Sequence, residues 1–161
     1  MPAIQAPRPD LRDRDGIVRL VDRFYERIRE DETLGPIFDR VAQVDWATHL
    51  PKMYDFWDTV LFRAGTFRGN PLGAHAKLVP VADMGWPTFE RWLTLFKATV
   101  AELFEGENAA IIVRSAEDMA NVIYSKINGV PDPRFDPANL TPEQRARYAA
   151  YRAKAEAANP A

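Results

Sequence analysis

The sequence has no cysteine among its 161 residues. Disulfide bonds, thiolate nucleophiles and zinc–thiolate sites are therefore excluded, and the absence fits a reducing compartment such as the cytoplasm. An excess of charge of one sign is also lacking, since 21 Lys and Arg residues stand against 23 Asp and Glu residues and the formal net charge is −2. No basic field is available to bind phosphate backbones, so we expect no nucleic-acid partner.

Long apolar runs are missing as well, and the first residues, MPAIQAPRPDLRDRDG, are charged and interrupted by prolines. We therefore expect neither a signal peptide nor a membrane span, but a soluble cytoplasmic protein. The length suits one domain, and a hydrophobic content of 47% can build one core. We predict a flexible segment over 1–14, a helical domain over 15–129, and a proline-rich linker with a C-terminal helical tail over 130–161.

Apolar residues recur at helical spacing along most of the chain, whereas strand signals are weak. The pattern predicts four main helices: one capped by Asp15, one from Asp45 to Gly65, one from Trp86 to Gly106 and one from Asn108 to Gly129. Pro51 lies inside the second of these, so residues 46–50 are expected to form irregular helix. In the last helix the pattern turns Ile111, Ile112, Met119, Val122, Ile123 and Ile127 inward. The fold class is predicted to be all-α.

The segment GNPLGAHAKL, residues 69–78, contains one of only two histidines. Asn70 can cap a helix, Pro71 suits the first helical position and Pro80 limits its continuation, which predicts a helix of about two turns at most. His75 is thus an imidazole on a short, defined element, although a surface histidine is the ordinary interpretation of its position alone. The other histidine, His49, lies one helical turn before Met53.

Two histidines are too few for most metal sites that are built from protein ligands alone. HExxH, a glycine-rich phosphate loop and Gly-x-Ser-x-Gly are all absent. A haem iron needs only one imidazole, because the porphyrin supplies four nitrogens. Apolar side chains that could line a haem slot are Phe38, Met53, Phe56, Trp57, Leu72, Leu78, Phe89, Trp92 and Phe96. Such side chains are more often plain core, so the residues alone leave both interpretations open.

Four segments in register carry a more specific signal: FYERIREDETLGPIF, WATHLPKMYDFW, GNPLGAHAKL and FERWLTLF. Over about residues 15–128 the chain resembles the third group of truncated haemoglobins. The resemblance implies a two-on-two helical sandwich around haem b, with His75 as the proximal iron ligand. It also implies a distal group of Tyr25, His49 and Trp92, with Phe38 packed on the haem face. Lys52 and Arg68 are candidate partners for the haem propionates.

Hydrogen-bond donors aimed at bound O₂ stabilise the negative charge that the ligand gains from iron. We therefore expect a five-coordinate haem that binds O₂, CO, NO or peroxide and releases O₂ slowly, with His49 as a donor or gate. Conversion of NO or peroxide would need an external reductase, because the chain carries no flavin or nicotinamide domain; a carrier or sensor would not. The alternative is a cofactor-free helical interaction module, which the ordinary interpretation of each residue supports.

Overall fold

The computed structural model describes residues 6–132 and 134, together with 142–143, 146–147, 149–150 and 153–154 in the tail. Regular structure over residues 6–132 is entirely helical, which confirms the predicted fold class. The elements are α1 (Arg14–Glu30), the π-helical η1 (Ile37–Val41), α2 (Trp46–Phe62), α3 (Pro71–Ala76), α4 (Trp86–Leu103) and α5 (Glu107–Asn128). The described tail residues between 142 and 154 are helical, whereas most of the predicted linker lies outside the described residues.

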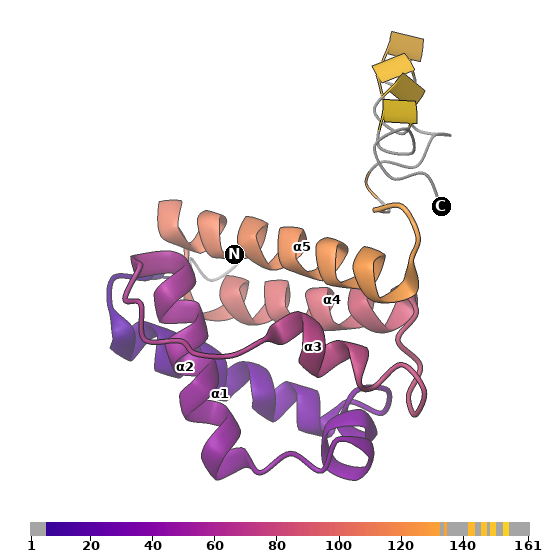
Figure 1. Cartoon of the computed structure of the whole chain (residues 1–161). Helices are drawn as coiled ribbons and strands as arrows, with labels where there is room; N and C mark the ends of the chain where they lie inside the picture. The colour runs from indigo at the N-terminus through magenta and orange to yellow at the C-terminus, as the bar shows by residue number, and fades with distance from the viewer. Residues whose placement is uncertain are drawn as a thin grey trace, which may run out of the picture.

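The helices form two layers of two (Figure 1). In one layer α4 and α5 lie side by side, and in the other α1 and α2 contact each other. Contacts of α1 with α4 and of α2 with α5 hold the layers together, and the short α3 packs on α5. None of the described helices has the length and apolar character that a membrane crossing requires.

Local chemistry accounts for where most helices begin. Asn70 accepts a hydrogen bond from the Gly73 amide at 3.0 Å, and Pro71 occupies the first position of α3, as predicted. Asp45 caps α2 as predicted. The prediction that Asp15 caps α1 is wrong, because Asp13 accepts from the Gly16 amide and Asp15 lies within the first turn. A carboxylate in that turn still favours the helix through the helix dipole.

The predicted irregularity before Pro51 is also wrong, because α2 is continuous from Trp46. The amide of His49 bonds to the Asp45 carbonyl at 2.8 Å, so the first turn is regular. A proline near a helix start removes few hydrogen bonds, since the first amides have no partner within the helix. The helix ends at Phe62, before the predicted Gly65, because Arg63 adopts a left-handed conformation with φ of 57°.

Gly106 does not end α4, which stops at Leu103, but directly precedes α5 with φ of 131°. A side chain at this glycine would lie 2.6 Å from the Asp10 carboxyl carbon. Asp10 approaches so closely because its carboxylate accepts hydrogen bonds from the Asn108 and Ala109 amides at 3.0 and 2.9 Å. The glycine therefore permits an N-terminal residue to cap α5. Gly129 ends α5 as predicted.

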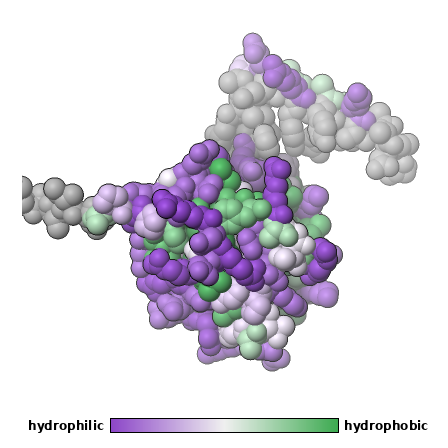
Figure 2. All heavy atoms as spheres, turned by 90° about the vertical axis from the view of Figure 1, so that its left-hand side faces the viewer, coloured by the Kyte–Doolittle hydropathy of each residue, from purple (hydrophilic) through white to green (hydrophobic). Residues whose placement is uncertain are grey.

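The core is built mainly from the apolar stripe of α1, whose predicted members are all buried: Ile17, Leu20, Val21, Phe24 and Ile28. From α5 the prediction for Val122 is wrong, since its side chain is 42% exposed. The other large exposed hydrophobic residues described are also valines, at scattered positions. Figure 2 shows one face of the molecule, where hydrophilic side chains surround smaller hydrophobic areas.

Candidate functional site

His75 is oriented by its own helix. Its Nδ1 lies 2.6 Å from the carbonyl oxygen of Pro71, one turn earlier in α3. A carbonyl oxygen can only accept, so Nδ1 must carry the proton and donate. The other ring nitrogen, Nε2, then keeps a free lone pair in the neutral imidazole, which is the form that binds metal ions. The half-buried ring lies with its centroid 6.3 Å from that of Phe89.

His49 presents a different environment, on α2. Its Nε2 is buried and has no hydrogen-bond partner among the described residues. Burial lowers the pKa of His49, and the nearby Lys52 and His75 lower it further, so the imidazole is neutral near pH 7.

A cluster of rings surrounds His49, and we call Tyr25, Phe38, Trp46 and His49 the ring cluster. The centroid of His49 lies 5.2 Å from Tyr25, 5.7 Å from Trp46 and 6.3 Å from Phe38. These side chains come from α1, η1 and the first turn of α2, so the cluster depends on tertiary packing. Tyr25, Phe38 and His49 were predicted site residues, and the structure brings them together.

The Tyr25 hydroxyl is held as a donor. The side chain is only 5% exposed, and burial raises the pKa of the phenol well above its usual range, so the group keeps its proton. No hydrogen bond within the described residues involves this hydroxyl. His49 Nε2 is buried without a partner among the described residues, and since buried polar groups are normally paired, this nitrogen needs a partner from elsewhere.

For Trp92, the third member of the predicted distal group, the structure records ring contacts within the core. Within the described residues its ring contacts are with Phe24, Trp57 and Phe96, at 5.4, 6.5 and 5.4 Å between centroids. It is stacked on Trp57 and Phe96, and Phe24 lies between it and Tyr25. Its indole N–H makes no hydrogen bond within the described residues. Trp92 thus borders the site from the core side, behind Phe24.

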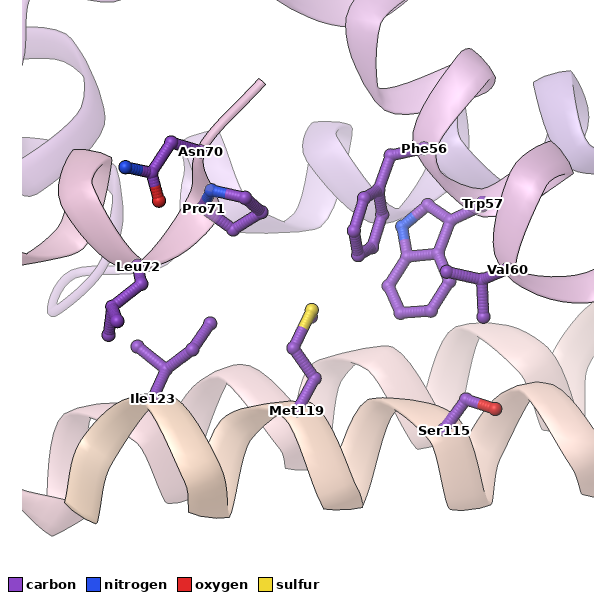
Figure 3. Close-up of a pocket in the computed structure, with 9 residues that line it drawn as sticks. All are labelled: Phe56, Trp57, Val60, Asn70, Pro71, Leu72, Ser115, Met119 and Ile123. Atoms are coloured by element: carbon purple, nitrogen blue, oxygen red, sulfur yellow. The ribbon is translucent and has the colours of Figure 1, made fainter. Parts of the chain in front are cut away.

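A largely apolar pocket of about 370 Å³ lies between α2, α3 and α5 (Figure 3). Its lining residues are Phe56, Trp57, Val60, Asn70, Pro71, Leu72, Ser115, Met119 and Ile123. Three predicted lining residues, Phe56, Trp57 and Leu72, border it, and α5 supplies Ser115, Met119 and Ile123, which the prediction did not include. A flat apolar group entering between α2 and α3 would meet this surface.

The remaining predicted residues do not line this pocket. Phe89 is buried, and Phe38, Met53 and Leu78 are partly buried and pack against the core. Lys52 and Arg68 are exposed. Arg68 donates to the Gly65 carbonyl at 3.1 Å, so it is partly engaged by its own loop. The two cations are therefore accessible to solvent rather than directed into the interior.

Trp46 is the site residue that sequence reasoning missed. Its position three residues before His49, at the start of a helix, was the available signal, since residues at this spacing share a helix face. Its ring centroid lies 5.3 Å from that of Tyr25 and 6.0 Å from that of Phe38. Trp46 therefore closes the outer side of the ring cluster.

These residues can hold a metal only with help from a prosthetic group. The described part of the chain has no group of three or more His, Cys, Asp or Glu side chains that could hold a metal ion. It does offer one oriented imidazole lone pair, on His75, and one buried imidazole nitrogen without a partner, on His49. An apolar pocket borders the start of α3 at Asn70, Pro71 and Leu72. This donor set fits haem, which requires one axial imidazole and an apolar slot.

The two-layer helical arrangement and a single oriented imidazole define the class of the protein as a shortened globin. A crystal structure of the group III truncated hemoglobin from Campylobacter jejuni matches it with a TM-score of 0.66 and 29% identity, covering 74% of this chain and 94% of that chain. The curated group 3 truncated hemoglobin Ctb of Campylobacter jejuni is 32% identical over 117 residues, which span 68% of this chain and 90% of the relative. No family model matches. The chain belongs to the group 3 truncated haemoglobins.

Proposed function

We propose that the chain binds haem b between α2 and α3, with the iron on Nε2 of His75, and binds O₂ and related diatomic ligands on the side of the ring cluster. The observation that supports this most directly is the oriented imidazole of His75. His75 has its Nδ1 occupied and its Nε2 lone pair free, while Tyr25 and His49 carry groups that lack partners within the described residues.

The absence of cysteine favours haem b over a covalently attached haem, because thioether attachment uses cysteines. When bound, the haem supplies an iron that binds the diatomic ligand and shares electron density with it. Tyr25 would donate a hydrogen bond from its phenolic O–H to a ligand held there, and neutral His49 would donate one from a ring N–H. Phe38 and Trp46 exclude water, which strengthens these electrostatic interactions. The ligand is thereby retained.

Retention of O₂ suits consumption of a ligand better than its delivery. The proposal therefore includes reaction with NO or peroxide, with electrons from a separate reductase in the cytoplasm. The Tyr25 phenol supports this proposed reactivity most strongly. Its side chain is buried, and its hydroxyl keeps its proton and makes no hydrogen bond within the described residues. O₂, CO, NO and peroxide are the proposed ligands.

The test is the absorption spectrum of the purified protein during titration with haem. Stoichiometric uptake, and a Soret band that shifts when CO is added to the reduced protein, are the expected results. A colourless protein that does not take up haem would contradict the proposal and favour a helical interaction module. Stopped-flow mixing of the O₂-bound form with NO then tests the reaction, and NO consumption no faster than with free haem would count against it.

A further inference from the structure

The turn between α1 and η1 is tied to α4 by one carboxylate. Asp31, which directly follows α1, has a side chain that is only 6% exposed. Its Oδ1 accepts a hydrogen bond from Nε of Arg91 in α4 at 2.8 Å, and Nη2 of the same guanidinium lies 2.7 Å from it. Its Oδ2 accepts from the backbone amides of Thr33 and Leu34 at 3.1 and 3.0 Å. The carboxylate therefore fixes the turn and also its distance from α4.

The carboxylate of Asp31 is ionised, and the guanidinium balances its charge. Burial by itself raises the pKa of Asp31, but the hydrogen bonds from Arg91 and from the Leu34 and Thr33 amides outweigh it, and the pKa lies below its ordinary value of 3.8. Removal of Arg91 would leave a buried charge without its countercharge, which is unfavourable. The two side chains therefore act as a unit, and the loss of either one loosens the turn.

The same turn carries the start of η1. Leu34, whose amide is held by Asp31, is buried, and its carbonyl oxygen accepts from the Phe38 amide at 3.3 Å. The next residue, Gly35, lies so close to α1 that a side chain there would be 2.7 Å from the Arg29 carbonyl oxygen. The turn therefore has little room to shift toward α1, and the position of Asp31 is passed to Phe38 through two consecutive hydrogen bonds.

Phe38 is the member of the ring cluster that η1 supplies. Its ring centroid lies 5.9 Å from that of Tyr25, 6.0 Å from that of Trp46 and 6.3 Å from that of His49. The element itself is a single π-helical turn without a buried residue, so it has little packing of its own to hold it. At its far side Asp39 accepts from the Trp46 indole at 2.9 Å. The contacts at the two ends of η1 therefore decide where Phe38 lies.

We propose that Asp31 and Arg91 are positioning residues, which hold η1 at a fixed distance from α4 and thereby keep Phe38 in the ring cluster. The inference rests on the proposed haem function, since their effect reaches a bound ligand only through that cluster. Loss of the pair lets η1 shift and admits water among the rings. Water weakens the hydrogen bonds that the ring cluster directs at the ligand, because electrostatic interactions are stronger in a dry site.

The experiment measures O₂ dissociation and the C–O stretching frequency of the reduced, haem-loaded full chain. Arg91→Ala should accelerate O₂ dissociation several-fold and shift the C–O frequency. Arg91→Lys should restore part of the wild-type behaviour, because an ammonium supplies the charge without the two donors of the guanidinium.

Lys97→Ala is the matched control. Lys97 lies on the same helix, is 47% exposed against 48% for Arg91, and pairs at 2.7 Å with Glu117 of α5 rather than with the turn. Its removal should leave O₂ dissociation and the C–O frequency unchanged. Equal changes in this control would overturn the proposal. Wild-type O₂ and CO behaviour in Arg91→Ala, with only a lower free energy of unfolding, would overturn it as well.

A double variant decides whether the effect passes through Phe38. In a Phe38→Leu background, Arg91→Ala should change O₂ dissociation much less than it does in wild type, because residues that act through one another are not additive. An undiminished effect would mean that the pair acts by another route and would overturn the proposal.

Hydrogen exchange separates this inference from the proposed function. In the full chain, with and without haem, the Leu34 and Phe38 amides should exchange faster in Arg91→Ala than in Lys97→Ala. Equal exchange in the two variants, with normal haem uptake, would overturn only the positioning of η1. Failure of the wild-type chain to take up haem would be seen in the Soret band and would contradict the proposed function itself.

Discussion

The two sides of the candidate site are built in different ways. On the side of His75, a helix of six residues contains no buried residue, and its functional side chain is oriented by one hydrogen bond within a single turn. On the side of Tyr25 and His49, rings from α1, η1 and α2 pack into the ring cluster, and Tyr25 is only 5% exposed. The geometry of the first side is set by neighbouring residues in the chain, and the geometry of the second side is set by tertiary packing.

The two sides therefore suit different tasks. The side of His75 suits holding a cofactor, and the side of Tyr25 and His49 suits controlling what reaches it. A metal ligand needs a lone pair in a fixed direction, which a cap, a proline and a backbone carbonyl can supply. Control of a small ligand needs donors in a dry cavity, which only a packed interior can supply. The predictions below test the two sides against each other.

The largest effect is expected on the side of α3. His75→Ala removes the one imidazole whose lone pair is left free by the Pro71 contact, so haem should be lost or its reduced CO spectrum abolished, with recovery on addition of free imidazole. The measurement compares the absorption spectra of His75→Ala and His49→Ala with that of wild type. His49→Ala is the control and should retain the iron. A normal spectrum in His75→Ala would place the iron ligand elsewhere.

Next in size is the loss of the phenol in Tyr25→Phe. A hydrogen bond to a charged acceptor contributes about 1.5–3 kcal/mol, so O₂ dissociation should accelerate about 10- to 100-fold. Stopped-flow O₂ displacement by CO measures this. The free energy of unfolding should hardly fall, because the hydroxyl makes no hydrogen bond within the described residues.

Trp92→Phe is the comparison for this donor, with a smaller acceleration expected because Trp92 packs behind Phe24 on Trp57 and Phe96. A larger effect for Trp92 than for Tyr25 would show that the indole, not the phenol, is the main donor.

A matched pair of cap substitutions compares the two sides directly. Asp45→Ala and Asn70→Ala should each weaken one helix by about 1 kcal/mol. For α2 the loss should lower the free energy of global unfolding in urea, because this helix carries buried Trp57 and Asp58. For α3 it should appear mainly as faster hydrogen exchange at the Gly73 and Ala74 amides, since the helix buries no residue. Equal effects of the two substitutions on the free energy of global unfolding, measured at the same haem and CO saturation, would contradict this difference between α2 and α3.

The smallest effect expected is on the pH dependence of stability. The pKa of His49 is lowered in the folded state from its ordinary value of 6.5, chiefly by burial. Its contribution to stability is therefore complete above pH 6.5 and is lost as pH falls through the folded-state pKa, because the unfolded chain binds the proton first. Urea unfolding between about pH 8 and pH 5 should show this loss in wild type and a flatter profile in His49→Gln. Identical profiles would mean that His49 is readily protonated in the folded protein.

Sequence reasoning succeeded where the determinants are close together in the chain. The apolar stripe of α1, the caps Asp45 and Asn70, and the short α3 were all predicted correctly, because spacing and capping act over a few residues. It failed at the ends of some helices, where either a neighbouring or a distant residue made the contact. Asp13 displaced Asp15 as the cap of α1, and Gly106 was predicted to end α4 although Asp10, almost a hundred residues away, engages the start of α5.

The ring cluster shows the same limit. Trp46 was counted as an ordinary apolar residue, since its contact with Tyr25 depends on how α1 and α2 cross. Phe24 likewise contacts both Tyr25 and Trp92, an arrangement that depends on how α1 and α4 pack. Contacts of this kind between distant segments follow no periodic pattern in the sequence, so the sequence alone does not predict them.

The sequence by itself determined an all-helical chain with one imidazole on a capped, proline-initiated turn, because hydrogen bonds and dihedral preferences within a turn are set by neighbouring residues. Only the tertiary structure decided that Tyr25, Trp46 and His49 would pack in one ring cluster and that the second imidazole would have a buried nitrogen without a partner among the described residues. Burial and the removal of water depend on segments far apart in the chain, and these properties make the site selective.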